Sequence, residues 1–352
     1  MIPMIPTPDA IPTSWGYFQF FLLLTFPLHL FFMNSLLGST GVALYAHIKG
    51  DEDSKGLAYE LAKVIPLLVA LTVNFGVAPL LFVQVIYGHL FYASSILMGV
   101  FWILIVPILL IAYYATYWYD FKFAALGRAG ILVLGCGYLL FLLVGFFLSN
   151  NLTLMQHPES WSVYFDNASG TLLNSGDVTL WPRYLHFMVG GSAIGGLFVA
   201  LYGRFLTRSK PEIGALATRV GLKLFLVLTL VEVAVGFWFL LALPRELMLL
   251  FMGRSGLATA SFMASLLLTL VALFAAWKQR VYLATAAGAL LVVAMVFMRD
   301  ILRGGYLKEV FSMEMLQVVP EYSPLLFFLV TLVIGLILVA WMIRAALTRC
   351  EG

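Results

Sequence analysis

Five histidines occur in this sequence, and two of them, His29 and His186, fall deep inside runs of apolar residues. An ionisable side chain at that depth in a membrane costs about 3 kcal/mol unless a partner or a function compensates for it. His29 is therefore either a functional group or a histidine that is hydrogen-bonded to a neighbouring helix. His47 and His157 fall at a run end and in a loop and are predicted to be solvated, whereas the depth of His89 is ambiguous.

His186 stands in "RYLHFMVGGSAIGG", about six residues into its apolar run, and Arg183 precedes it by three residues on nearly the same helix face. Small residues follow at Gly190, Gly191, Gly195 and Gly196. They let a helix or a flat macrocycle approach the backbone closely. The imidazole could bind a haem iron, the guanidinium could bind the haem propionates, and the glycines would leave room for the ring. Together these residues indicate a haem site, although glycines alone also serve helix packing. The two cysteines, Cys136 and Cys350, form no attachment motif, so such a haem is bound non-covalently.

Met263 is the predicted second ligand of that iron. It lies about seven residues into a run that enters the membrane from the same side as the run of His186, so the two side chains are expected at similar depth. Histidine with methionine is a six-coordinate haem pair used for electron transfer. Methionine is also a common gap filler in apolar cores, and the chain has 14 of them. The competing candidates are Met252, Met298 and His89.

The elements that must position these residues are membrane helices. Hydrophobic residues make up 62% of the chain and charged residues 11%, a balance outside that of soluble domains. Runs long enough to cross the bilayer predict an all-α polytopic bundle of nine transmembrane helices in one domain, 1–352. The predicted spans are 17–46, 61–87, 91–119, 128–149, 180–205, 218–243, 256–277, 281–299 and 323–347. A turn between the second and third spans is placed near Gly88 and His89.

Charge sets the predicted topology. An outside N-terminus places most of the 20 Lys and Arg residues, including those of "FLTRSKPE", on the cytoplasmic side, as the positive-inside rule requires. Residues 1–16 then form an outer segment, and the long loop 150–179, which has no Lys or Arg, also lies outside. The segment before the first span lacks the features of a cleaved signal peptide, so that span is retained. The net charge of +3 reflects topology and excludes a nucleic-acid-binding surface.

Three stretches resemble subunit I of the cytochrome bd quinol oxidases. "QFFLLLTFPLH" (19–29) is similar to the first helix of that family, "NFGVAPLLFVQVIYGHLFY" (74–92) to its second helix and following loop, and "RYLHFMVGGSAIGG" (183–196) to its fifth helix. The resemblance covers about the first two thirds of the chain. It implies that His186 is the ligand of a low-spin haem b with Met263 as partner, and that His29 is the axial ligand of a second haem.

The chain departs from that family at three places. The third span contains none of the acids that the family uses for proton delivery, and the eighth span has no carboxylate before Asp300. The quinol-binding loop is reduced to "LPRELMLLFMGR". Oxygen reduction by this chain is therefore expected to be lost. Quinol is expected near Glu232, the one acid deep inside a span, or near the cluster of Arg245, Glu246 and Arg254; Glu232 is otherwise a protonated packing residue.

The expected function is a haem-b-containing electron-transfer subunit of a cytochrome bd-like respiratory complex in the bacterial inner membrane, with its C-terminus in the cytoplasm. It would carry one or two haems b and pass electrons between quinol and an outer partner, a periplasmic multihaem c-type cytochrome, alongside other membrane subunits. One alternative is the degenerate second subunit of a bd-type quinol:oxygen oxidase. An alternative of another class is a cofactor-free membrane scaffold or transporter, against which the scarcity of mid-membrane charges and paired broken helices counts.

Overall fold

A computed structural model describes residues 5–350, with side chains as far as Ala345. The first four and last two residues, which belong to the predicted outer segment and tail, lie outside the described residues. Within the described part, nine helices are long and apolar enough to cross a membrane, which confirms the predicted all-α, nine-span bundle. They are α1 (Trp15–Lys49), α2 (Glu52–Leu97), α3 (Gly99–Phe121), α5 (Ala129–Gln156), α6 (Leu180–Leu206), α7 (Pro211–Ala242), α9 (Gly256–Trp277), α10 (Val281–Leu307) and α11 (Ser323–Cys350).

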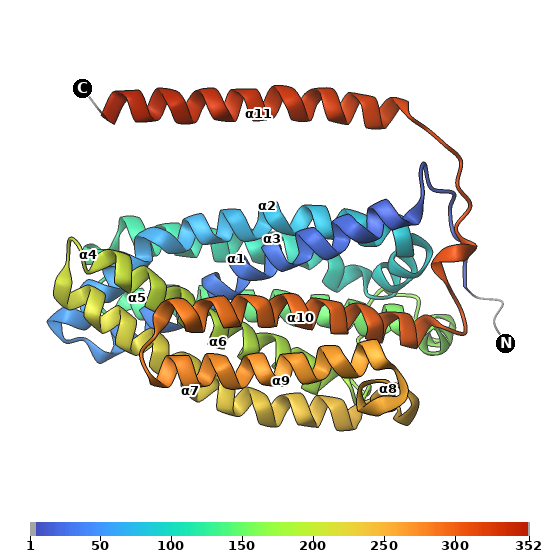
Figure 1. Cartoon of the computed structure of the whole chain (residues 1–352), viewed down its shortest axis with the longest axis horizontal. Coiled ribbons are helices and arrows are strands. Elements are labelled where there is room, and N and C mark those ends of the chain that lie inside the picture. Colours follow the sequence, from blue (N-terminus) through green and yellow to red (C-terminus); the bar gives the residue numbers. More distant parts are fainter. Residues whose placement is uncertain (1–4, 351–352) are drawn as a thin grey trace.

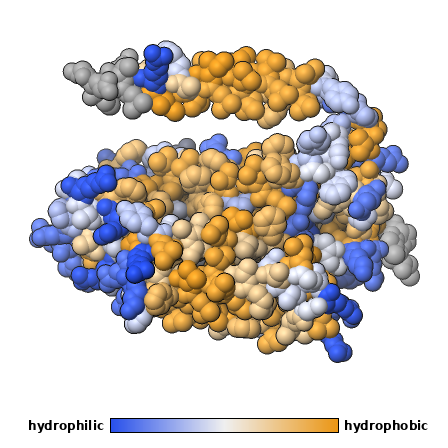
Figure 2. Space-filling view, viewed as in Figure 1, coloured by the Kyte–Doolittle hydropathy of each residue, from blue (hydrophilic) through white to orange (hydrophobic). Residues whose placement is uncertain are grey.

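Helices α1 to α10 lie alongside one another, whereas α11 lies apart from them (Figure 1). Apolar side chains cover the middle of the molecule and hydrophilic ones gather toward its ends (Figure 2). Short elements connect the long helices: α4 (Phe123–Leu126), η1 (Pro158–Phe165), α8 (Arg245–Leu249), η2 (Leu250–Arg254) and η3 (Met313–Met315). We call the end that carries the N-terminal segment and the residues 166–179 the outer end, after the predicted topology, and the opposite end the inner end.

The break predicted near Gly88 and His89 is present as a kink one residue earlier, at Tyr87, where two helices meet within α2. The φ and ψ of Tyr87, −115° and 21°, are not helical. A second helical piece then runs to Leu97, and the chain turns at Met98. A glycine in a helix interior costs about 1 kcal/mol, so Gly88 does not prevent the helix from resuming after the kink.

Two other predicted boundaries at the outer end also move. Helix α5 continues to Gln156, so the first seven residues of the predicted loop 150–179 are helical, and Asn150 and Asn151 are buried. Helix α10 continues to Leu307, eight residues beyond the predicted end of its span. Asp300 therefore lies within helix α10 and not in the segment that follows it.

The connection between α1 and α2 has well-defined caps. Gly50 ends α1 with a φ of 75°, a left-handed conformation that favours glycine. Asp51 then caps α2, where its carboxylate accepts a hydrogen bond from the backbone N–H of Ser54 at 3.1 Å. Hydrogen bonds from the Ser54 backbone and hydroxyl, with Lys49 beside them, lower the pKa of Asp51 to about 2. The carboxylate therefore stays ionised, as an N-terminal cap requires.

Helix α6, which carries His186, packs between α1 and α7 through glycines on two faces. A Cβ at Gly195 would lie 2.1 Å from the carbonyl oxygen of Asn34 on α1, and one at Gly38 would lie 2.3 Å from the carbonyl carbon of Gly195. On the other face, a Cβ at Gly196 would lie 2.7 Å from the carbonyl oxygen of Gly221 on α7. These backbones are in direct contact, so α6 is locked in the centre of the bundle.

Helix α11 contributes little to the bundle, since nearly all of its described side chains are exposed. The segment before it is anchored at the outer end, where Ile11 and Val318 pair in an isolated bridge. We therefore expect a chain truncated after Tyr322 to keep the thermal unfolding midpoint of the full chain in detergent. A large fall in that midpoint would contradict this, and would mean that α11 stabilises the bundle.

Candidate functional site

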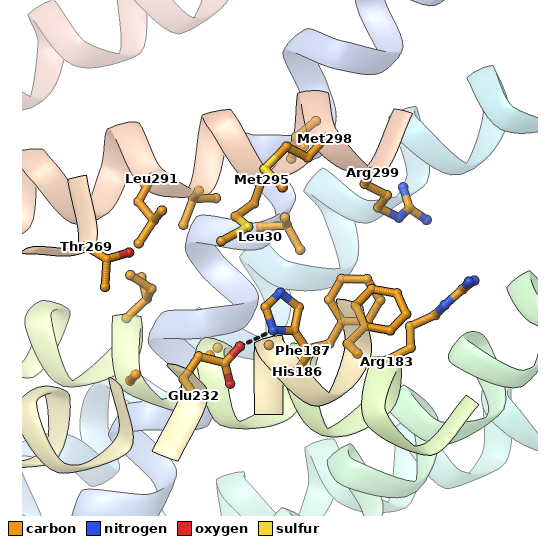
Figure 3. A pocket seen from close by; sticks show the side chains of 18 of the residues that line it. Leu30, Arg183, His186, Phe187, Glu232, Thr269, Leu291, Met295, Met298 and Arg299 are labelled. Atoms are coloured by element: carbon orange, nitrogen blue, oxygen red, sulfur yellow. Dashed lines mark ion pairs between the residues drawn. The ribbon is translucent and has the colours of Figure 1, made fainter. Parts of the chain in front are cut away.

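A cavity opens inside the bundle between α1, α6, α7, α9 and α10. The cavity has a volume of about 250 Å³, and most of its lining is apolar. Its ionisable side chains lie at two places, the pair of His186 and Glu232 in the middle and the guanidinium groups of Arg183 and Arg299 toward the outer end (Figure 3). An apolar cavity with a few converging polar groups is the usual form of a binding site.

His186 on α6 and Glu232 on α7 form an ion pair in which imidazole Nδ1 contacts carboxylate Oε1. Their side chains are only 20% and 15% exposed. The helices make room for the pair reciprocally: a Cβ at Gly190 would lie 3.2 Å from Oε1 of Glu232, and one at Gly236 would lie 3.6 Å from Cε1 of His186. Each polar side chain thus lies over a glycine of the opposite helix.

The ion pair bears on which nitrogen of His186 is available. When Glu232 is ionised it can only accept a hydrogen bond, and Nδ1 would then carry the proton that is donated to it. The lone pair of Nε2 would in that case be free for a metal or a hydrogen-bond donor. Figure 3 shows the ring of His186 with Glu232 on one side and Met295 and Met298 on the other.

The structure does not bring the predicted ligand Met263 to His186. Met263 is 50% exposed on α9, outside the cavity lining, and the competitor Met252 is 59% exposed. Met298, the third methionine considered, does line the cavity, and so does Met295, which the sequence reading did not single out. Similar depth in the membrane placed Met263 correctly along its helix but said nothing about its rotation about the helix axis. The residue before it, Phe262, faces the cavity instead.

Arg183 lies at the outer end of the cavity and is buried, with 4% exposed. Its Nη1 donates a hydrogen bond to Oε1 of Gln156 at 2.5 Å, and its Nε and Nη2 have no hydrogen-bond partner among the described residues. The guanidinium carbon lies 5.4 Å from the centre of the Phe239 ring. A buried guanidinium with unsatisfied donors is costly, which favours an anionic group as its missing partner.

Arg299 on α10 is the second guanidinium that lines the cavity, and it was missed because its span was predicted to end there. It lies over the ring of Phe26, 4.4 Å from the ring centre. Neither Arg183 nor Arg299 forms an ion pair with a carboxylate in the described part of the chain, whereas the neighbouring Arg303 pairs with Asp300. The outer end of the cavity is therefore positively charged.

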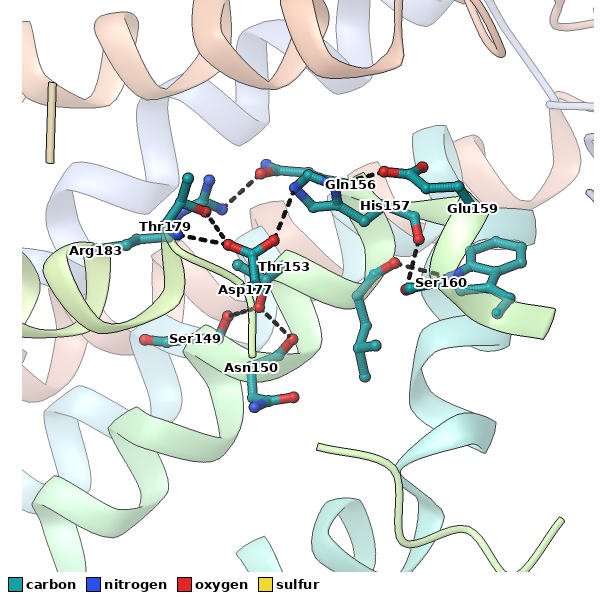
Figure 4. Close-up of polar contacts among 12 residues, drawn as sticks. Ser149, Asn150, Thr153, Gln156, His157, Glu159, Ser160, Asp177, Thr179 and Arg183 are labelled. Carbon is teal, nitrogen blue, oxygen red and sulfur yellow. Dashed lines mark hydrogen bonds and ion pairs between the residues drawn. The ribbon is translucent and has the colours of Figure 1, made fainter. Parts of the chain in front are cut away.

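Side chains from α5 and the outer loop hold Arg183 in place (Figure 4). Next to Gln156, His157 contacts Glu159 through Nδ1 at 2.7 Å and Asp177 through Nε2 at 3.3 Å. Asp177 also accepts hydrogen bonds from the backbone N–H and hydroxyl of Thr179. His157 is only 17% exposed, so it is less solvated than predicted. Its ion pairs with Glu159 and Asp177 of the outer segment leave the histidine partly buried.

The remaining predicted histidines lie elsewhere in the bundle. His29 packs against Gly76 on α2, and its Nδ1 donates to the carbonyl oxygen of Thr72 at 2.9 Å, which is the hydrogen-bonded alternative considered for it. His89 is buried at the outer end, with its ring centre 4.8 Å from that of Phe311. His47 was predicted to be solvated but is buried, with Nδ1 2.9 Å from the Tyr119 hydroxyl.

The glycines after His186 divide their roles. Gly190 and Gly191 line the cavity, whereas Gly195 and Gly196 make the backbone contacts with α1 and α7. Helix packing, one of the two uses considered from the sequence, is therefore present on this helix. In the part of the chain that the structure describes, no group of three or more His, Cys, Asp or Glu side chains could hold a metal ion. Neither a protein-family model nor a curated protein matches this sequence.

Proposed function

We propose that this chain is a haem-b-containing electron-transfer subunit of a cytochrome bd-like complex in the bacterial inner membrane. It would pass electrons between membrane quinol and an outer-side partner, a multihaem c-type cytochrome. The observation that carries the proposal is the cavity, in which a histidine oriented by a carboxylate lies beside a positively charged outer end. The likeness of three sequence stretches to subunit I of the bd oxidases supports the same function.

The residues around the cavity fit a haem b. His186 offers one ring nitrogen to an iron, and the macrocycle itself supplies four more. The unsatisfied Nε and Nη2 of Arg183, with Arg299 beside them, suit the two propionates of the haem. Haem b, when bound, supplies a one-electron iron couple. Its propionates at the arginines would direct one edge of the ring toward the outer end, where the partner is proposed to bind.

The protein side chains have defined tasks in this proposal. The apolar lining excludes water, which lowers the local dielectric constant and strengthens the charge interactions of Arg183 and Arg299. Glu232 is already paired with His186, so it is not available to a quinol. We place quinol instead at the outer cluster, where Glu246 of α8 forms an ion pair with Arg254 of η2 that is exposed to solvent. The neighbouring Phe251 lines the cavity, so this cluster adjoins it.

The degenerate second subunit of a bd-type oxidase is the other candidate, and the position of His29 favours it. His29 lies outside the cavity lining, and its Nδ1 donates a hydrogen bond to the backbone carbonyl oxygen of Thr72 on α2. A chain in which this histidine only joins two helices would carry one haem and would support a complete subunit I. Co-purification with an intact subunit I, in place of a c-type cytochrome, would select this candidate.

The visible spectrum of the purified chain tests the proposal. Dithionite-reduced protein is expected to show the bands of a low-spin b-type haem, with a haem content that a pyridine haemochrome assay measures. A colourless chain that resists reconstitution with added haem would contradict the proposal and leave the scaffold or transporter alternative.

Met295 would be the second protein ligand of a bound haem iron, because it lines the cavity on the side of His186 opposite Glu232 and because the sulfur of Met298 already accepts a hydrogen bond from Ser265. Met295→Leu is expected to keep the haem but to move it to high spin and lower its midpoint potential, since thioether ligation raises the potential. Met263→Leu is the matched control and should change neither. If only Met263→Leu changes the spectrum, Met263 is the iron ligand, as the sequence predicts, and the assignment of Met295 is wrong.

A further inference from the structure

Glu232 is a buried carboxylate in the middle of a membrane span, and its position is built into two helices. It forms an ion pair with Nδ1 of His186, and neither of its oxygens has a hydrogen-bond partner among the described residues. The glycine opposite each side chain, Gly190 for Glu232 and Gly236 for His186, leaves the space that the pair needs. A helix contact alone would not need a carboxylate here, where its desolvation is expensive.

The charged side chains that line the cavity have opposite signs at its outer end and in its middle. Arg183 and Arg299, at the outer end of the cavity, place positive charge near any ligand held there. Positive charge stabilises the reduced state of a haem iron, because that state carries one electron more. Among the described residues, Glu232 is the only carboxylate that lines the cavity, so it supplies the opposing negative charge.

The contact between Glu232 and Nδ1 of His186 would carry this influence to a metal bound at Nε2. When Nδ1–H is donated to a carboxylate, the imidazole gains electron density at Nε2 and becomes a more basic ligand. A more basic ligand with a negative charge behind it stabilises the oxidised iron. The same bond fixes the tautomer and the ring orientation, which keeps Nε2 directed into the cavity.

We infer that Glu232 is a positioning residue that presents Nε2 of His186 to the cavity and lowers the reduction potential of the haem bound there. This inference rests on the proposed function and adds to it a determinant of the potential. In this arrangement Glu232 opposes Arg183 and Arg299, and the balance between these charges sets the direction in which electrons pass.

The test replaces the carboxylate while keeping the size of the side chain. In Glu232→Gln the amide oxygen still accepts the Nδ1–H bond, so the haem content is expected to match that of the wild type while the midpoint potential shifts upward. Glu232→Asp retains the charge with a shorter reach and is expected to restore part of the shift. Glu60→Gln is the matched control, because Glu60 is a buried carboxylate that binds Lys63 and Lys210 at the inner end, and its loss should leave the potential unchanged.

A second measurement does not need haem. In the haem-free chain, ¹⁵N NMR of His186 is expected to show a proton on Nδ1 in the wild type, in a strong hydrogen bond that weakens in Glu232→Gln. An unchanged potential in Glu232→Gln, in a protein whose haem content is unchanged, would overturn the positioning role while the haem site stands. A wild-type chain that binds no haem, or that keeps every haem after His186→Ala, would instead overturn the proposed function.

Discussion

His186→Ala is expected to remove the low-spin b-type haem signal completely while the protein still inserts into the membrane. In the part of the chain that the structure describes, His186 is the only histidine that lines the cavity, so its loss removes the only imidazole ligand there. The bundle should survive, because the substitution removes one partly buried ring and its contact with Glu232 and leaves the glycine contacts of α6 intact. The haem-to-protein ratio, measured by pyridine haemochrome assay, is expected to fall to near zero.

His29→Ala is the companion variant for this experiment. His29 is also a membrane histidine, but it packs on Gly76 and bonds to Thr72 outside the cavity. The structure therefore predicts that His29→Ala keeps the haem of the cavity and its spectrum. Loss of one of two haems in His29→Ala would show that the second site implied by the family resemblance exists, and retention of the signal in His186→Ala would refute the assignment of His186.

Gly195→Leu is expected to have the largest effect on stability. A side chain at this position would enter the backbone of α1, since even its Cβ would lie 2.1 Å from the carbonyl oxygen of Asn34. Overpacking of a core usually costs about 1–3 kcal/mol, and backbone atoms cannot rotate away as a side chain can, so a loss of about 3 kcal/mol or more follows. The thermal unfolding midpoint in detergent should fall sharply, and haem should be lost with it.

Gly304→Leu provides the control, because no atom lies within 4 Å of a Cβ built on Gly304 of α10. The same substitution there should be neutral or slightly stabilising, since leucine favours a helix by up to about 1 kcal/mol over glycine. Equal unfolding midpoints for the two variants would mean that the contact between α1 and α6 is not as tight as the structure has it.

Membrane insertion and the number of spans were determined by the sequence alone. Each span needs only length and apolar composition, because a helix satisfies its own backbone hydrogen bonds in lipid. The sequence also predicted that His186 and Arg183 lie on nearly the same face of one helix, because residues three apart in a helix are neighbours. Their burial at one cavity agrees with that expectation. Helix ends were less accurate, as α5 and α10 show, because polar residues at the outer end are buried inside the fold.

The partners of His186 were decided by tertiary structure. Glu232, which pairs with His186, lies on another helix, and so does Met295, the proposed iron ligand. Met263 lies on a face outside the cavity lining. In a soluble helix the apolar stripe shows which face points inward, but a membrane span is apolar on every face, since lipid takes the place of water. Rotation of each helix about its axis is set by contacts such as that of Gly195 with α1, and these contacts form only when the helices have assembled.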